Sequence, residues 1–384
     1  MFSYHRHVLR HFYSTTTKTR GINNSTIVPP SILALHDRAR ALDVKRTIVL
    51  PEGGDERMQK AAAMAVELGL ANILVLDDTG SAVCNLPSHI QVLHPRDHPR
   101  FQELTHAYCL RRARKKFPSE TFEQASDSPT YAKDLEQASS SLYFGNLLVR
   151  DTDECDGSVA GAVNSSGGTV SAAIKVLGLD RGVSTLSSFF IMSFPETEAT
   201  PLPIRGKTKI FADCAVVVAP DSEQLAEIAI HAAKNAVRFL PEEEGPPRIG
   251  LLSFSTKGSS NAEEATIVRQ ALDCIHRRKE DNGIATDGCV YDGELQLDAA
   301  ILPHVAASKA PGSDIGGDAN VLVFPNLGAG NIGYKMAERM AGAVAVGPIL
   351  QGLAHPANDL SRGCTTEDIL DVIAVTALQS VAKG

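Results

Sequence analysis

The stretch that decides the fold is RTIVLPEGGDERMQKAAAMAVELGLANILVLDD, residues 46–78. Its two ends are short β-branched and aliphatic runs that predict strands, and residues 55–70 between them have the apolar spacing of an amphipathic helix. A strand, a helix and a second strand in this order form a βαβ unit, in which the two strands run parallel. The stretch therefore predicts an α/β fold.

The same alternation continues to the end of the chain. Further strands are predicted at 157–163, 248–255, 320–325 and 343–349. We expect mostly parallel sheets covered by helices on both faces, which is a three-layer arrangement. Ligands of such sheets bind at the carboxyl ends of the strands, so the loops that follow the strands are the places to look for a site.

Two proline-rich segments interrupt this rhythm, at 194–210 and 240–248, and neither is long enough to be a free linker. With 384 residues the chain is long enough for two domains. We predict two α/β domains that face each other across a cleft, with the active site in the cleft. The predicted boundaries are 29–181 plus 351–384 for the first domain and 182–350 for the second.

The composition favours a protein whose ligands are small molecules. The formal charge of -8 comes without acidic or basic blocks in the body of the chain, which excludes nucleic acid and an anionic membrane as expected partners. The seven cysteines have no CxxC or zinc-like spacing, so we expect reduced thiols in an intracellular compartment and no metal site. No apolar run reaches the roughly 18 residues of a membrane-spanning helix.

The first 28 residues have a different composition. They are rich in serine and threonine, contain four lysines and arginines, and the chain has no acidic residue before Asp37. This composition is typical of an organelle transit peptide, and the plain alternative is a disordered tail. The RHFYS string favours the mitochondrial matrix, with a plastid as the alternative destination. We therefore exclude residues 1–28 from the fold.

A glycine-rich turn, NLGAGNIGYK at 326–335, has G-x-G-x-x-G spacing between a predicted strand and a predicted helix. The acid that a dinucleotide site needs about 20 residues later is missing, and no Lys-Ser or Lys-Thr follows as in a nucleotide P-loop. Two interpretations stay open. The turn either presents backbone N–H groups and Asn331 to a phosphate or substrate, or it only packs tightly.

A second loop, STKGSS at 255–260, also joins a strand to a helix. It combines hydroxyls, a cation and a helix N-terminus, which predicts an anion site. The plain alternative is a serine helix cap beside a solvated lysine. The candidate binding residues of this loop are Ser255, Thr256, Lys257, Gly258 and Ser259.

The string NDLSRGCTTEDI at 358–369 holds the strongest candidates for chemistry. An arginine such as Arg362 can grip a phosphate with two hydrogen bonds, which a lysine cannot. Asp368 could take a proton, although Thr365 and Asp368 also have the T-x-x-D spacing of a capping box. We expect Cys364 to be a small packed thiol, since no histidine is tied to it in sequence.

Several of these strings closely resemble the phosphate acetyltransferases, over about residue 32 to the end. The strings are LPEGGDERMQKAA (50–62), FADCAV (211–216), LLSFSTKGS (251–259), YDGELQLDAAILPHVAASKAPGS (291–313), VFPNLGAGNIGYKMAERM (323–340) and GPILQGLAHPANDLSRGCTTEDI (347–369). The resemblance implies reversible transfer of an acetyl group between coenzyme A and inorganic phosphate. It also implies a homodimer, with acetyl-CoA, coenzyme A, acetyl phosphate and phosphate as substrates and without a permanently bound cofactor or a catalytic metal.

The resemblance assigns roles to the C-terminal loop. Asp368 takes the proton of the coenzyme A thiol, Arg362 clamps the phosphate, and Ser361 helps to hold the thiolate. Arg111 matches an arginine that contacts coenzyme A in relatives, although a basic helix face is its plain reading. Ser165 and Ser166 are further candidates for substrate binding.

The chain also departs from the family pattern. Ser171 replaces an arginine, and Asn164 and Gly168 stand where a histidine and an acid are common. We expect a weaker or rearranged coenzyme A site, with Lys175, one helical turn after Ser171, as a substitute cation.

Three functions follow from these observations. The first is a phosphate acetyltransferase. The second is a phosphate butyryltransferase-like enzyme with another acyl group. The third is a non-catalytic acyl-CoA-sensing module, like the similar C-terminal domain of some malic enzymes, which the replacement at Ser171 keeps open although Ser361, Arg362 and Asp368 are intact.

Overall fold

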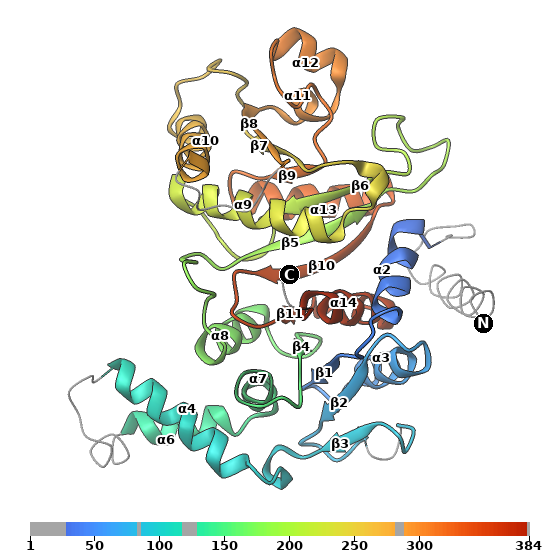
Figure 1. The fold of residues 1–384 in the computed structure, drawn as a ribbon, viewed down its shortest axis with the longest axis vertical. Coiled ribbons are helices and arrows are strands. Elements are labelled where there is room, and N and C mark those ends of the chain that lie inside the picture. The colour runs from blue at the N-terminus through green and yellow to red at the C-terminus, as the bar shows by residue number, and fades with distance from the viewer. Residues whose placement is uncertain (1–27, 83–85, 117–128, 281–287, 382–384) are drawn as a thin grey trace. The chain divides into compact units, whose positions relative to one another are not determined.

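The computed structural model describes residues 28–82, 86–116, 129–280 and 288–381 (Figure 1), so the predicted transit peptide lies almost entirely outside the described residues. The chain divides into two compact units. Unit 1 comprises Arg181–Gly352 and the segment that ends at Ala34, and unit 2 comprises Leu35–Asp180 and Leu353–Gly384. Each unit is an α/β structure, so the predicted fold class is confirmed.

Unit 2 contains one parallel sheet in the strand order β11-β4-β1-β2-β3. Its strands are β1 (Thr47–Leu50), β2 (Asn72–Leu76), β3 (Gln91–Leu93), β4 (Gly157–Ala160) and β11 (Ala357–Asp359). Its helices are α3 (Glu56–Glu67), α4 (Phe101–Lys116), α6 (Pro129–Ala138), α7 (Ser141–Asp151), α8 (Ser166–Val176) and α14 (Thr366–Gln379), with a 3-10 turn η2 (Pro95–Asp97). Helix α2 (Pro30–Arg40) begins in unit 1 and ends in unit 2.

The predicted βαβ unit is β1, α3 and β2, with Thr47 paired to Asn72 and Leu50 to Val75 in parallel register. Ile48, Val49 and Leu50 are completely buried, as a central parallel strand requires. Helices α3 and α14 pack on each other over one face of the sheet, and α7 and α8 pack on each other over the opposite face (Figure 1). Because β1, β4 and β11 run parallel between these helix layers, their carboxyl ends lie together at one end of the sheet.

Unit 1 contains a mixed sheet in the order β10-β5-β6-β9-β7-β8. Its strands are β5 (Ser187–Ser193), β6 (Thr208–Ala212), β7 (Arg248–Leu252), β8 (Val290–Leu295), β9 (Val321–Val323) and β10 (Val344–Gln351). Its helices are α9 (Ser222–Phe239), α10 (Glu263–Glu280), α11 (Leu297–Ile301), α12 (Pro303–Lys309) and α13 (Leu327–Ala341), with a 3-10 turn η3 (Glu242–Glu244).

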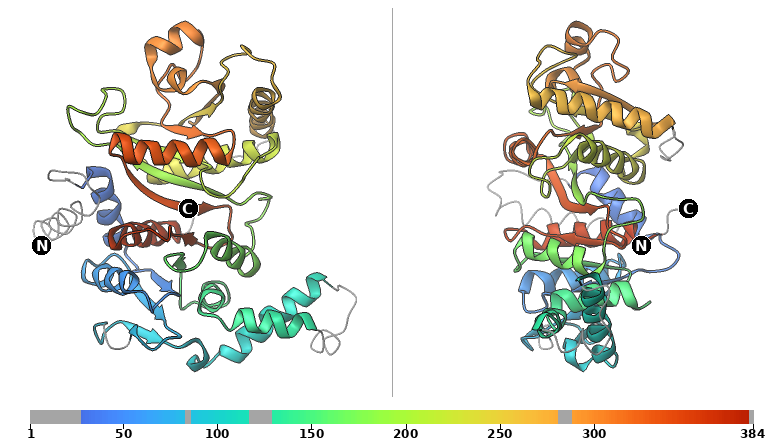
Figure 2. Two further views of the ribbon diagram at one scale, coloured as in Figure 1. Left: turned by 180° about the vertical axis from the view of Figure 1, so that it is seen from behind. Right: turned by 90° about the vertical axis from the view of Figure 1, so that its left-hand side faces the viewer.

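Strands β5, β6 and β10 make the antiparallel part of this sheet. Between β5 and β6 the chain runs through a proline-rich segment in which no helix is assigned, and it returns antiparallel to β5, with Ser193 paired to Thr208. Helices α9 and α10 cover one face of the sheet and α13 covers the other (Figure 2). No helix within the described ranges has the length and apolar character needed to cross a membrane.

Candidate functional site

Three loops of unit 2 meet where the parallel strands of its sheet have their carboxyl ends, and we call this end of the sheet its carboxyl edge. They follow β1 (residues 51–55), β4 (161–165) and β11 (360–365), and these three strands are direct neighbours in the order β11-β4-β1. Since the strands are parallel, all three loops leave the sheet at the same edge. This edge brings together the predicted residues Ser361, Arg362 and Asp368 from one loop and helix start with Ser165 and Ser166 from the next.

The loop after β4 wraps around a carboxylate. Glu52, only 7% exposed, accepts hydrogen bonds from four consecutive backbone N–H groups at residues 161–164, at 2.8 to 3.2 Å, and a fifth from the Asn164 side chain at 2.8 Å. Backbone N–H groups arranged in this way form an anion-binding concavity. Here the chain's own glutamate occupies it, so Glu52 fixes the shape of the loop.

The loop after β11 presents Ser361 and Arg362 at the surface. Both side chains are exposed, and the Arg362 guanidinium has no hydrogen-bond or ion-pair partner within the described part of the chain. The loop is closed by the N–H of Cys364, which donates to the carbonyl of Ser361 at 2.8 Å, while the Ser361 hydroxyl accepts from the N–H of Gly363 at 3.3 Å. An uncommitted guanidinium beside a helix N-terminus is suited to an incoming anion.

Asp368 forms the capping box that its spacing with Thr365 predicts. The Asp368 carboxylate accepts from the N–H of Thr365 at 2.8 Å, and the Thr365 hydroxyl accepts from the N–H of Asp368 at 3.2 Å. The predicted capping box is therefore present. The role of Asp368 in proton transfer is a separate prediction, which the cap does not test. Cys364 is a buried thiol, as predicted, and burial raises the pKa of this thiol to about 12.

A buried acid that the sequence reasoning missed lies at the end of β11. Asp359 is 2% exposed, and its Oδ1 has no hydrogen-bond partner among the described residues. Burial raises the pKa of Asp359 to about 6, although the Ser166 hydroxyl and the N–H of Leu360 act in the opposite direction. Little in the sequence signals this acid, because Asp359 follows Asn358 at the end of a strand of three residues, inside the quoted string NDLSRG.

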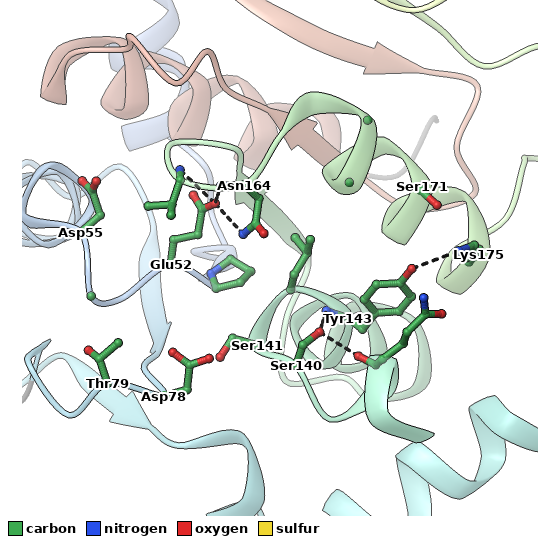
Figure 3. A pocket seen from close by; sticks show the side chains of 17 residues that line it. Glu52, Asp55, Asp78, Thr79, Ser140, Ser141, Tyr143, Asn164, Ser171 and Lys175 are labelled. Atoms are coloured by element: carbon green, nitrogen blue, oxygen red, sulfur yellow. Dashed lines mark hydrogen bonds between the residues drawn. The ribbon is translucent and has the colours of Figure 1, made fainter. Parts of the chain in front are cut away.

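Beside these loops lies a pocket of about 810 Å³ (Figure 3). Asp55 and Asp78 line one end, and Tyr143, Ser171 and Lys175 line the other. The Lys175 ammonium donates to the Tyr143 hydroxyl at 3.3 Å and lies 5.9 Å from the centre of its ring. The structure thus brings Ser171 and its predicted substitute Lys175 into the same pocket.

Of the two predicted serines of the β4 loop, Ser165 has a capping role, and the Ser166 hydroxyl bonds to Asp359. Ser165 is the N-cap of α8, and its hydroxyl accepts from the N–H of Gly168 at 3.2 Å. Both Ser165 and Ser166 are exposed. Arg111, on α4, makes a two-pronged ion pair with Asp151 at 2.7 and 3.2 Å, so its guanidinium is already engaged.

The loop at 255–260 belongs to unit 1, and acidic side chains take up much of its donor capacity. The Ser255 hydroxyl and the N–H of Gly258 donate to Glu294 at 2.7 and 2.8 Å. Burial alone would raise the pKa of Glu294, but these hydrogen bonds outweigh burial and lower it. The other hydroxyls of the loop also have partners: those of Thr256, Ser259 and Ser260 accept from the N–H groups of Gln296, Thr256 and Ala262 at 3.0, 3.1 and 3.2 Å.

Lys257, in the same loop, has φ of 48° and donates to Asp292. The predicted anion site therefore holds two carboxylates of the protein as neighbours, and an anion would have to compete with them. Its role in binding stays a prediction.

The glycine-rich turn at the start of α13 is tightly packed. A Cβ on Gly330 would lie 2.3 Å from the carbonyl oxygen of Asp213, which no side chain tolerates. Asn331 donates to the carbonyl of Cys214 at 3.2 Å. Close packing, the second of the two interpretations of this turn, accounts for Gly330. In the described ranges no group of three or more His, Cys, Asp or Glu side chains is placed to hold a metal ion.

Comparison with known proteins bears directly on this arrangement. Residues 33–377 match the phosphate acetyl/butaryl transferase family. The chain is 40% identical to the phosphate acetyltransferase of Staphylococcus epidermidis over 354 residues, which cover 90% of this chain and 98% of that protein. It is also 40% identical to the phosphate acetyltransferase of Paracoccus denitrificans over 347 residues, with the same coverage.

Solved structures give the same result. The EutD phosphotransacetylase from Staphylococcus aureus is 38% identical with a TM-score of 0.74, over 91% of this chain and 98% of that one. A phosphotransacetylase from Streptococcus pyogenes is 34% identical with a TM-score of 0.76, over 91% and 99% of the two chains. The match covers both units and all three loops at the sheet edge of unit 2. The chain belongs to the phosphate acetyl/butaryl transferase family.

Proposed function

We propose that this protein is a phosphate acetyltransferase, an acyltransferase that moves an acetyl group reversibly between coenzyme A and inorganic phosphate. Coenzyme A, acetyl-CoA, acetyl phosphate and phosphate are its substrates. The observation that carries the proposal is the loop after β11, where the guanidinium of Arg362 stays uncommitted beside Ser361 and the start of α14. Family membership over nearly the whole chain supports the same reaction.

In the proposed mechanism the thiol sulfur of coenzyme A attacks the carbonyl carbon of acetyl phosphate. Asp368 accepts the thiol proton, whose ordinary pKa of about 8.5 makes a base necessary near neutral pH. The bond between the carbonyl carbon and the phosphate oxygen then breaks, and phosphate leaves with the electron pair. Arg362 neutralises that charge with two hydrogen bonds, and Ser361 donates to the thiolate.

Purified protein tests this reaction directly. With acetyl-CoA as substrate, release of free thiol should depend on added phosphate, and acetyl phosphate should form in equal amount. Arg362→Ala should lower kcat/KM by about 100-fold because the leaving phosphate loses its charge partner, and Arg362→Lys should recover only part. Phosphate-independent release, or an Ala variant as active as wild type, would refute the assignment.

The same assay separates the acyl groups. Propionyl-CoA and butyryl-CoA should react more slowly than acetyl-CoA if the protein is an acetyltransferase. Faster reaction with butyryl-CoA would favour a butyryltransferase, and binding without turnover of any acyl-CoA would favour a sensing module.

We further propose that the protein is a homodimer. On α13, Ile332, Met336 and Met340 are exposed and lie at i, i+4 and i+8, so they share one face of the helix. Three large apolar side chains on one helix face are more than a solvated surface needs, and a second copy of the chain is the partner that the proposal names. The proposed location is the mitochondrial matrix, with a plastid as the alternative, on the composition of residues 1–28.

A further inference from the structure

A single guanidinium ties together the three loops at the sheet edge of unit 2. Arg57 lies in the first turn of α3 and has five N–H groups. Its Nη1 donates to the carbonyls of Arg362 and Cys364 at 2.9 and 3.0 Å. Its Nη2 donates to the carbonyl of Ala162 at 2.8 Å. The remaining N–H groups, one on Nη2 and one on Nε, donate to Asp55 at 2.8 and 3.1 Å.

Asp55 holds this guanidinium in its plane. It is the N-cap of α3, where it accepts from the backbone N–H groups of Arg57 and Met58 at 2.8 and 3.3 Å. These two backbone hydrogen bonds therefore fix the orientation of the carboxylate that pairs with the Arg57 guanidinium. The hydrogen bonds to Asp55 raise the pKa of Arg57 above its ordinary value, so Arg57 remains charged at every pH that the fold survives.

The two carbonyls that Arg57 holds flank Gly363, in the turn that carries Ser361 and Arg362. Two hydrogen bonds join residues of the turn to one another: the N–H of Cys364 donates to the carbonyl of Ser361 at 2.8 Å, and the N–H of Gly363 donates to the Ser361 hydroxyl at 3.3 Å. Without Arg57 the turn would keep these ties and the capping box at Thr365, but both carbonyls would lose their charged donor. The chain would then lose the contacts that fix two peptide planes, the one between Arg362 and Gly363 and the one between Cys364 and Thr365.

A lysine could not replace this arrangement. Its ammonium has three donors in tetrahedral directions, whereas the five donors of Arg57 lie in one plane and reach four different residues. The third loop enters through Ala162, which belongs to the run of backbone N–H groups wrapped around Glu52. Arg57 therefore joins the rigid loop around Glu52 to the turn that carries Arg362.

We infer that Arg57 is a positioning residue for acyl transfer: its guanidinium sets the shape of the 361–364 turn and thereby the placement of Ser361 and Arg362. The inference rests on the proposed function, since it assigns the turn a part in that reaction. It predicts two separate effects of losing Arg57. The turn opens, and the chemical step slows although Ser361, Arg362 and Asp368 are all present.

Cys364 reports the first effect independently of activity. Its side chain is 7% exposed, and burial holds the pKa of its thiol at about 12, so alkylation by iodoacetamide should be very slow in the wild type. The charge of Arg57 lowers the pKa of this thiol, but burial is the larger influence. Opening of the turn should therefore speed alkylation even though a positive charge has been removed.

The variants are Arg57→Ala and Arg57→Lys, with Arg46→Ala as the matched control. Arg46 is also a half-buried arginine of unit 2, 26% exposed against 31% for Arg57, and pairs with Asp156 at 3.0 Å, but it precedes β1 and touches none of the three loops. The full chain is assayed for kcat and KM with acetyl-CoA and phosphate. Iodoacetamide labelling of Cys364 is followed by peptide mass spectrometry at a temperature well below each melting point.

We expect kcat of both Arg57 variants to fall by about 100-fold, as a displacement of about 1 Å can cause, and KM for acetyl-CoA to change by less than about 3-fold. Cys364 labelling should be at least about 10-fold faster, and added guanidinium ion should restore part of kcat in Arg57→Ala alone. Arg46→Ala should change neither readout. If Arg57→Ala does not fold, Arg57→Lys carries the same test.

Unchanged kcat in a folded variant would overturn the inference, and so would unchanged labelling of Cys364 with a reduced kcat. Labelling that rises equally in Arg46→Ala would show a general loss of stability instead, which also overturns it. If the wild type transfers no acyl group at all, the proposed function fails. The labelling result would then still decide whether Arg57 holds the turn.

Discussion

At the scale of single residues, Asp368 has two roles to satisfy with one carboxylate. It accepts the N–H of Thr365 in a capping box, while the proposed reaction needs it to accept a proton as well. A cap residue can do both only if the thiol proton reaches an oxygen lone pair that the cap leaves accessible. Substitutions on the two sides of the box separate these roles.

Asp368→Asn should lower kcat by about 100-fold or more and cost less than about 1 kcal/mol of stability, because asparagine retains a capping oxygen but takes up no proton. Thr365→Ala removes the other half of the box and should cost about 1 kcal/mol of stability while most of kcat remains. Melting temperature and turnover are measured on the same samples. If both variants lost only stability, Asp368 would be a cap and nothing more.

Asp359 predicts an unusual dependence of stability on pH. Its pKa is raised by burial to about 6, from 3.8, so the folded protein binds this proton more tightly than the unfolded chain does. The resulting stability is complete below about pH 4 and is lost as the pH rises through 6. Asp359→Asn removes the titration, so its stability relative to wild type should improve between pH 4 and 7 by roughly 2 to 3 kcal/mol.

Asp77 supplies the control for this prediction, because it is also a buried acid after a strand of the same sheet. Burial alone would raise its pKa, but it accepts from the Thr79 hydroxyl at 2.6 Å and from the N–H groups of Ala82 and Thr79 at 2.7 and 2.8 Å, and these bonds outweigh burial and lower the pKa. The relative stability of Asp77→Asn should therefore worsen over the same pH range. Urea unfolding at several pH values measures both slopes, and equal slopes would contradict the assignment for Asp359.

At the scale of elements, the apolar patterns predicted existence and type better than direction. The strands predicted at 157–163, 248–255 and 320–325 appear as β4, β7 and β9, and each pairs with its neighbours in parallel. The strand predicted at 343–349 appears as β10 but runs antiparallel to β5. Strand direction depends on which neighbour a strand pairs with, and a local pattern carries no information about that neighbour.

The glycine-rich turn shows the same limit. Its spacing suggested either an anion site or packing, and the deciding fact is the approach of Gly330 to the carbonyl of Asp213, 117 residues away. The loop at 255–260 is similar, since its donors could be read from the sequence but their acceptor, Glu294, comes from the neighbouring strand β8. Motif chemistry can be predicted from sequence, but partners distant in sequence cannot.

Helix α13 carries the element-scale prediction. Of its residues, all of which are described, Gly330 alone is buried, and Met340 is 79% exposed. Met336→Asp and Met340→Asp should weaken the proposed dimer by at least about 100-fold, because each would bury an unpaired carboxylate in the interface. Melting of the monomer should hardly change, since neither side chain is packed.

Sedimentation velocity across a range of protein concentrations measures this dissociation. Val237→Asp on α9 is the control, since Val237 is 64% exposed on a helix that covers the opposite face of the same sheet. A wild type that sediments as a monomer, or equal weakening by Val237→Asp, would show that the α13 face is not the dimer interface.

At the scale of the whole molecule, the site of unit 2 is assembled from segments that lie far apart in sequence. The chain leaves this unit after Asp180 and returns at Leu353, and the returning strand β11 adds to the edge of the sheet beside β4. That pairing is what brings the turn of Arg362 next to the loop around Glu52. The string LPEGGDER was visible as a family motif, but the contacts of Glu52 and Arg57 depend on this strand order, which no local pattern contains.

The last prediction concerns the first residues of the chain. Val28 is 1% exposed and Ile32 is completely buried, so the described part of the chain already contributes to the core from residue 28 onward. Removal of residues 2–27 should therefore leave the melting temperature almost unchanged and turnover within about 2-fold of the full chain, because Val28, Ile32 and the rest of the described core are retained.

A fluorescent protein fused after residues 1–28 should enter mitochondria, driven by the four basic residues. Changing Arg6, Arg10, Lys18 and Arg20 to glutamate should abolish import, because the segment then repels the negatively polarised inner membrane. Import of the variant with four glutamates, or diffuse fluorescence of the native fusion, would contradict the targeting role. Fluorescence in the plastids of a plant cell would instead favour the plastid, the alternative location.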